Sequence, residues 1–205
     1  MTRMWSTLRY GAAAVLVVGL VASALNSMSA GTFDALEFFS YFTIQCNLIG
    51  VAALVCAARF TGRPRPHWVE VLRVSAAVYL VVVVTVFWTM LAPGKEGGTV
   101  WTDWIGHLFS GVALVADWVV EGPRERVPWR RIGAVLAYPG VWLAVVLTRG
   151  ATDGWFPYPF LDPAHGYAAI TAVIAAIVAA GVVLCVVLFP LPRWRVLAPV
   201  AHHEL

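Results

Sequence analysis

The chain has 205 residues, of which 60% are hydrophobic and only 12% are charged, and its mean hydropathy is +0.79. A soluble domain carries about 25% charged residues, so this composition excludes an ordinary soluble fold and predicts a polytopic membrane protein. The net charge of +3 is not evidence of nucleic-acid binding, because the distribution of the charges along the chain matters more than their sum.

Six apolar segments are separated by charged residues, and a helix needs about 20 residues to cross the hydrocarbon core at about 1.5 Å per residue. We therefore predict an all-α fold, a six-helix transmembrane bundle that forms a single domain over residues 1–205. The predicted helices span residues 10–27, 36–59, 71–92, 102–120, 132–149 and 165–190.

The first apolar segment has some features of a signal peptide. Two arginines precede it, and small residues near Ser27–Ala30 loosely resemble a cleavage site. We favour a retained helix, because the apolar run is long for a signal sequence and six segments give a consistent topology.

Positive charge is concentrated on one side of the predicted topology. Of the 14 basic residues, only Lys95 and Arg149 lie on the other side. The positive-inside rule then places both termini, including Arg193 and Arg195 after the last helix, in the cytoplasm.

Two polar residues lie within segments that otherwise read as membrane-spanning. Thr43 lies about 10 Å from the start of the second predicted helix, and His107 about 8 Å from the start of the fourth. Both helices begin on the outer side, so the two side chains reach a similar depth. Because a polar group is costly to bury in lipid, we predict that Thr43 and His107 form one functional site, with the two side chains within about 5 Å.

The neighbours of this pair suggest nucleophilic chemistry. Ser40, Thr43 and Asn47 have the spacing i, i+3, i+7 and are expected to share a helix face. Asp103 precedes His107 by four residues, so its carboxylate can reach the imidazole and fix its tautomer. A hydroxyl, an imidazole and an orienting carboxylate are the parts of an activated nucleophile.

Each of these residues also has a structural interpretation. A threonine in a membrane helix commonly bonds the carbonyl one turn back, and a histidine near a helix entrance is often only hydrated. The amides of Gln45 and Asn47 suit either a developing oxyanion or contacts between helices. Asp103 also suits an N-terminal cap, and Asp117 lies near the cytoplasmic end, where partial hydration is expected.

An aromatic loop lies between the last two predicted helices. Its prolines exclude a helix, and Tyr158 and Phe160 suit a cap over a lipid-facing cavity or an ordinary interfacial belt. On the third helix, Trp88 and Thr89 suit packing or the wall of the same cavity.

Four short runs carry a resemblance to a known family. They are Tyr41-Phe42-Thr43-Ile44, Val86-Phe87-Trp88, His107 and Tyr158-Pro159-Phe160-Leu161, in this order. From the second helix to the sixth, the chain resembles the androgen-induced transmembrane family, which includes the androgen-dependent TFPI-regulating protein. It is also similar to a bacterial six-helix branch, and it departs from the animal proteins at Leu108-Phe109, where they carry polar residues.

The resemblance implies a multipass threonine hydrolase that cleaves fatty acid esters of hydroxy fatty acids, with Thr43 as nucleophile and His107 as the essential histidine. It also implies a bacterial cytoplasmic membrane. We expect no metal or organic cofactor, no nucleic-acid partner, and a lipid or fatty-acyl ester as substrate.

The alternative is a non-enzymatic membrane protein, either a small transporter or a scaffold. A transporter typically carries an inverted repeat with broken helices, and Pro139-Gly140 in the fifth helix is a candidate break.

Overall fold

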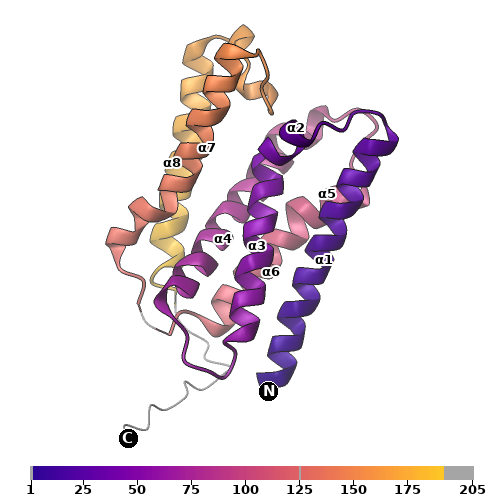
Figure 1. Ribbon diagram of the computed structural model, residues 1–205. Helices are drawn as coiled ribbons and strands as arrows, with labels where there is room; N and C mark the ends of the chain where they lie inside the picture. Colours follow the sequence, from indigo (N-terminus) through magenta and orange to yellow (C-terminus); the bar gives the residue numbers. More distant parts are fainter. Residues whose placement is uncertain (1, 125, 192–205) are drawn as a thin grey trace, which may run out of the picture.

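The computed structural model describes residues 2–124 and 126–191, which contain helices and no strand (Figure 1). Six helical stretches are long and apolar enough to cross a membrane, which confirms the predicted all-α polytopic bundle and fits an integral multipass membrane protein. The long helices are α1 Thr2–Ser29, α3 Phe42–Arg59, α4 His67–Val86, α6 Ser110–Glu121, α7 Ile132–Thr152 and α8 Tyr167–Leu188.

Shorter helical turns complete the structure. Two are π-helical, η1 and η3, and the others are short α-helices or 3-10 turns. Their bounds are α2 Ala35–Ser40, η1 Phe87–Leu91, η2 Ala92–Gly94, α5 Trp101–Trp104, η3 Ile105–Phe109, η4 Trp129–Arg131, η5 Pro159–Leu161 and η6 Pro163–His165.

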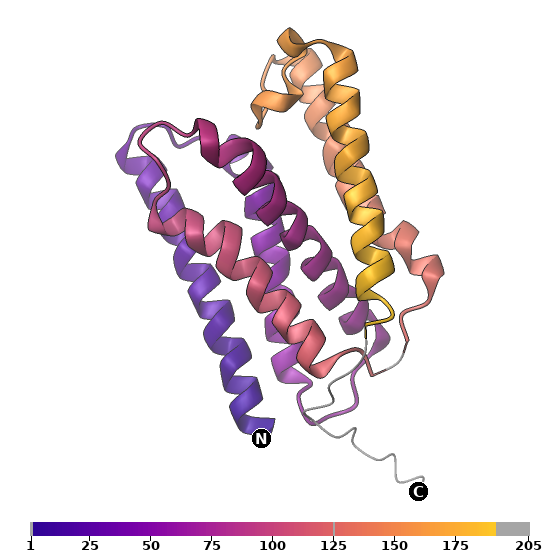
Figure 2. The same cartoon turned by 180° about the vertical axis from the view of Figure 1, so that it is seen from behind.

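The helices form two groups (Figures 1 and 2). In both views α1, α3, α4 and α6 lie together, and α7 and α8 form a separate antiparallel pair beside them. The N-terminus and the α3–α4 connection lie at one end of the bundle, which we call the basic end, and α2 and α5 lie at the opposite end. Arg193 and Arg195, which contribute to the predicted orientation, lie outside the described residues.

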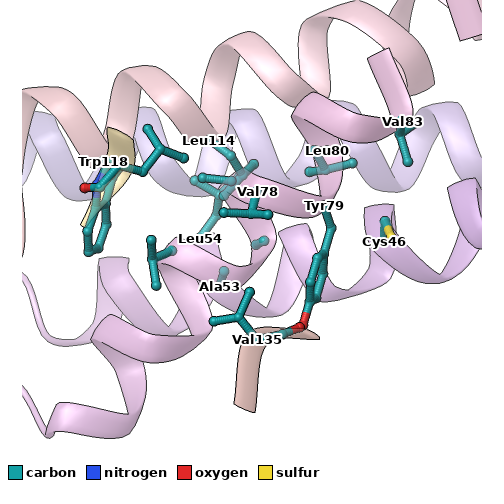
Figure 3. Close-up of a cluster of buried hydrophobic side chains, with 14 of the residues drawn as sticks. Cys46, Ala53, Leu54, Val78, Tyr79, Leu80, Val83, Leu114, Trp118 and Val135 are labelled. Atoms are coloured by element: carbon teal, nitrogen blue, oxygen red, sulfur yellow. The ribbon is translucent and has the colours of Figure 1, made fainter. Parts of the chain in front are cut away.

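The core fills the space between α3, α4 and α6 (Figure 3). Leu54, Leu80, Leu114 and Trp118 are each at most 1% exposed and pack in one cluster. Gly50 permits the close approach of α3 to α4, since an added Cβ would lie 2.9 Å from a methyl group of Leu80.

Hydrogen bonds tie the α7–α8 pair to this core, and one of them is donated by Trp118 Nε1 to the Leu188 carbonyl of α8 over 2.8 Å. The Tyr79 hydroxyl of α4 donates to the Val135 carbonyl of α7 over 2.5 Å. The α7 helix runs unbroken through Pro139, so the candidate break at Pro139-Gly140 does not interrupt it.

Two predicted helix starts are too late. We expected residues 10 and 71, but α1 begins at Thr2 and α4 at His67. The reason is that Arg9 and Glu70, which precede the predicted starts, are ion-paired within the bundle instead of being exposed at helix ends. Charged residues therefore do not mark the ends of these two helices.

The second predicted helix is wrong near its start, because the chain breaks at Tyr41. Tyr41 is extended (φ −64°, ψ 129°) and separates α2 from α3. Distant residues hold the break: Trp142 Nε1 donates to the Ser40 carbonyl over 2.8 Å, and Arg149 donates to the Ser40 hydroxyl over 3.2 Å. Ser40 and Thr43 therefore do not share one continuous helix face.

The basic end holds a buried group of alternating charges, here called the ionic cluster. Its carboxylates each contact at least two guanidinium groups, with Arg73 2.7 Å from Asp117 and Arg65 2.6 Å from Glu121. Asp117 is only 5% exposed, so the expectation that it is partly hydrated is wrong. The cluster comprises Arg9, Arg65, Glu70, Arg73, Asp117 and Glu121.

Candidate functional site

Thr43 and His107 meet at the end opposite the ionic cluster. Thr43 is the second residue of α3, and its Oγ1 lies 3.4 Å from Nε2 of His107 in η3. The distance confirms that the two side chains approach within about 5 Å. Their catalytic role stays a prediction.

The tautomer of His107 follows from its other ring nitrogen. Nδ1 lies 3.1 Å from the backbone carbonyl of Asp103. A carbonyl only accepts, so Nδ1 carries the hydrogen, and Nε2 presents its lone pair to the Thr43 hydroxyl. The imidazole is thus positioned to accept a proton from Thr43.

The carboxylate of Asp103 does not orient His107 as we expected. It pairs with Lys95 and accepts a hydrogen bond from the Val100 N–H over 2.8 Å, which caps the start of α5. The backbone carbonyl of the same residue makes the contact with the imidazole instead. The Asp103 side chain therefore acts as a helix cap, which is the alternative interpretation given above.

Two aromatic residues of η1 contact His107, one at its ring and one at its backbone. The ring of Phe87 stacks on His107 with centroids 3.7 Å apart and planes 14° from parallel. Trp88 Nε1 donates to the His107 carbonyl over 3.1 Å. Sequence reasoning gave Phe87 no role, although it lies within one of the runs that carry the family resemblance.

Both η1 and η3 are π-helical, and His107 lies at the centre of η3. Such turns are often found at functional sites. They have no simple sequence signature, so only the structure reveals them here.

The two amide side chains serve contacts between elements. Asn47 donates to the Thr43 carbonyl over 2.9 Å and to the Gly106 carbonyl over 3.1 Å, which joins α3 to η3. Gln45 donates to the Phe39 carbonyl and accepts from the Tyr138 hydroxyl. Asn47 thus uses both of its N–H groups and Gln45 uses one, and their role at an oxyanion stays a prediction.

Thr43 also borders a cavity of about 330 Å³ between α4 and the α7–α8 pair. Tyr158 and Phe160 of the aromatic loop line it, as predicted, together with Phe87. Trp88 and Thr89 do not line it: Trp88 packs against Trp104, and the Thr89 hydroxyl donates to the carbonyl one turn back. Aliphatic residues of α4, α7 and α8 contribute much of the remaining wall.

Tyr158 brings a second polar group to Thr43. The Thr43 backbone N–H donates to the Tyr158 hydroxyl oxygen over 3.4 Å. This N–H is available because it lies in the first turn of α3, where no carbonyl precedes it within the helix. Burial raises the pKa of Tyr158 to about 12, so the phenol keeps its proton at neutral pH.

No family model, curated protein or solved structure matches this chain. The geometry of the Thr43–His107 site and its cavity therefore carries the functional interpretation.

Proposed function

We propose that the protein is an intramembrane hydrolase of lipid esters, with Thr43 as nucleophile and His107 as base. The observation that carries this proposal is the 3.4 Å contact between Thr43 Oγ1 and His107 Nε2 beside a cavity of about 330 Å³. Catalytic contacts are commonly looser than about 3.2 Å before substrate binds.

The reaction follows the usual order of acyl transfer. Thr43 Oγ1 attacks the ester carbonyl carbon, and its proton passes to His107 Nε2. The tetrahedral intermediate then expels the alkoxide, which takes the proton from Nε2 and leaves as an alcohol. Water attacks the acyl-threonine with His107 again as base, which releases the fatty acid and restores the hydroxyl.

The donors nearest to Thr43 suit the developing oxyanion. Thr43 and Tyr158 both line the cavity, and the phenol oxygen accepts from the Thr43 N–H, so the substrate oxyanion would take the place of this 3.4 Å bond. Fixed donors of this kind stabilise the negative charge that forms in the transition state. They take the role that we first expected of the Gln45 and Asn47 amides.

The cavity supports a lipid substrate. Its wall consists mainly of aliphatic and aromatic side chains from α4, α7 and α8, such as Val83, Leu143 and Ile177. Such a wall favours an acyl chain over a polar substrate. The resemblance to the threonine hydrolases of the androgen-induced family suggests fatty acid esters of hydroxy fatty acids, and a site open to the outer leaflet of a bacterial cytoplasmic membrane.

The non-enzymatic alternative fits these observations less well. A scaffold needs no hydroxyl held against the lone pair of an imidazole. A transporter with a broken fifth helix is disfavoured, because α7 is continuous through Pro139 and Gly140.

Covalent labelling tests the proposal. A fatty-acyl p-nitrophenyl ester should acylate the purified protein, and mass spectrometry of peptides should place the acyl group on Thr43. Thr43→Ala should abolish the adduct, whereas Thr89→Ala should retain it, because Thr89 lies outside the cavity lining. Equal labelling of the Thr43→Ala variant would refute Thr43 as the nucleophile.

A further inference from the structure

A second cavity lies at the basic end, far along the bundle from Thr43. It has a volume of about 400 Å³ and lies between the start of α1 and the end of α3. We call it the arginine pocket, because Arg3, Arg59 and Arg63 line it together with Thr2, Ser6 and Thr61. A volume of this size falls in the range of about 300–1,000 Å³ that is usual for small-molecule sites.

Within the described residues, no carboxylate balances the charge of this pocket. No described acidic side chain pairs with Arg3, Arg59 or Arg63, and no acidic residue lines the pocket. The nearby carboxylates of Glu70 and Glu121 are already bound by arginines of the ionic cluster. The described part of the chain therefore leaves these three guanidinium groups open to an anionic ligand.

Hydrogen bonds join the two walls of the pocket. The Ser6 hydroxyl donates to the Ala58 carbonyl over 3.2 Å, and Arg9 donates to the Thr61 hydroxyl over 2.7 Å, so that α1 is tied to α3 and its following loop. Gly62 has a φ of +74°, and an added Cβ would lie 3.2 Å from Thr2 Cγ2. This glycine lets the loop pass close to the start of α1.

We propose that the arginine pocket binds the phosphate group of an anionic phospholipid. Guanidinium groups match the geometry of phosphate oxygens better than any other side chain does. The pocket lies at the basic end, where a spanning helix begins and another ends, which is the level of lipid headgroups. Basic pockets between transmembrane helices at the cytoplasmic face are known to receive such headgroups.

The Arg59→Gln/Arg63→Gln variant tests this assignment, with Arg126→Gln/Arg130→Gln as its control. Each pair removes two positive charges from exposed arginines on the same predicted side of the membrane, but only the first pair belongs to the pocket. Binding to the full-length protein in detergent would be measured by native mass spectrometry with phosphatidylglycerol, phosphatidylcholine and soluble glycerol phosphate.

We expect phosphatidylglycerol to bind more tightly than phosphatidylcholine, and the pocket variant to bind it about 30-fold more weakly, since each basic residue contributes about fivefold. The control should change by less than about twofold, and both variants should keep the parental Tm without added lipid. Equal losses in the two variants, or equal binding of the two lipids, would overturn the pocket assignment. If glycerol phosphate bound as tightly as phosphatidylglycerol with the same dependence on Arg59 and Arg63, a soluble phosphate would be the ligand and the lipid assignment would be wrong.

Discussion

The two ends of the bundle bury polar groups in opposite ways. At the basic end, Arg73 and Asp117 are at most 5% exposed, and each is bonded to two oppositely charged partners. At the opposite end, Thr43 and His107 share one contact of 3.4 Å beside a cavity and belong to no ion pair. The ionic cluster is formed by paired charges, whereas Thr43 of the Thr43–His107 pair lines a cavity.

This difference separates stability from chemistry. Buried charges are costly to leave without partners, so the ionic cluster should determine whether α1, α4 and α6 stay together. A single hydroxyl or imidazole contributes little to helix packing in lipid. Substitutions of Thr43 or His107 should therefore lower activity and leave stability unchanged. Substitutions at the two ends of the bundle should therefore affect different measurements.

The largest effect is expected at the proposed site. Thr43→Ala and His107→Ala should each lower kcat/KM for a fatty-acyl ester by about 10³-fold or more. The double variant should show a similar loss, because the two side chains act in the same proton transfer. Thr43→Ser should keep part of the activity, since it retains the hydroxyl.

Thr89→Ala is the matched control, because this threonine also lies in a membrane-spanning stretch but only bonds the carbonyl one turn back. It should retain the parental rate. If the losses of the two single variants multiplied in the double variant, Thr43 and His107 would not act as one unit.

The ionic cluster should show the reverse behaviour. Asp117→Asn or Arg73→Met should lower the free energy of unfolding by about 3–5 kcal/mol, because each leaves buried charges without a partner. The double variant Asp117→Asn/Arg73→Met should lose less free energy of unfolding than the two single variants together, since Arg9–Glu121 and Arg65–Glu70 remain paired. Denaturant unfolding in micelles measures the free energy of unfolding. The rate of ester hydrolysis per folded molecule should not change.

Arg130→Gln provides the comparison for these variants, because this arginine is exposed and outside the cluster. It should alter stability by less than about 0.5 kcal/mol. An equally small effect of Asp117→Asn would contradict a structural role for the cluster.

Tyr158→Phe should lower kcat by about 10²-fold with little change in KM, because it removes one donor to the oxyanion and keeps the ring. Tyr138→Phe is its control, since that hydroxyl binds Gln45 and not Thr43. With the Tyr158 pKa raised to about 12 by burial, this phenol should cause no fall in rate between pH 7 and about pH 10. A parental kcat in Tyr158→Phe would remove the phenol from the mechanism.

The sequence predicts some features of the fold well and others poorly. Apolar runs of membrane-spanning length identify all six spans, because the bilayer imposes that length on every spanning helix. The break at Tyr41 has no glycine or proline to mark it, and it is held by Trp142 and Arg149, about 100 residues away. Contacts of this range are not readable from local pattern.

The candidate site also has features that the sequence predicts and features that depend on distant contacts. Helix depth places Thr43 near His107, because both helices start at the same end of the bundle. The role of the Asp103 carboxylate is not predictable from its i, i+4 spacing, since Lys95 in the preceding connection competes for it. The sequence likewise suggests that Arg9 and Asp117 are charges at helix ends. Their ion pair joins residues 108 positions apart and is visible only in the structure.

The smallest effect is expected for Asp103→Asn, which distinguishes the backbone from the side chain as the group that orients His107. The backbone carbonyl stays in place, and only the partly exposed pair with Lys95 is lost. Such pairs contribute about 0–1 kcal/mol, so kcat should change by less than about fivefold. Lys95→Gln should have the same small effect, because it removes the same pair from the other side. If the carboxylate itself held the imidazole, as in serine proteases, the loss would approach about 10⁴-fold, and the two variants would then differ sharply.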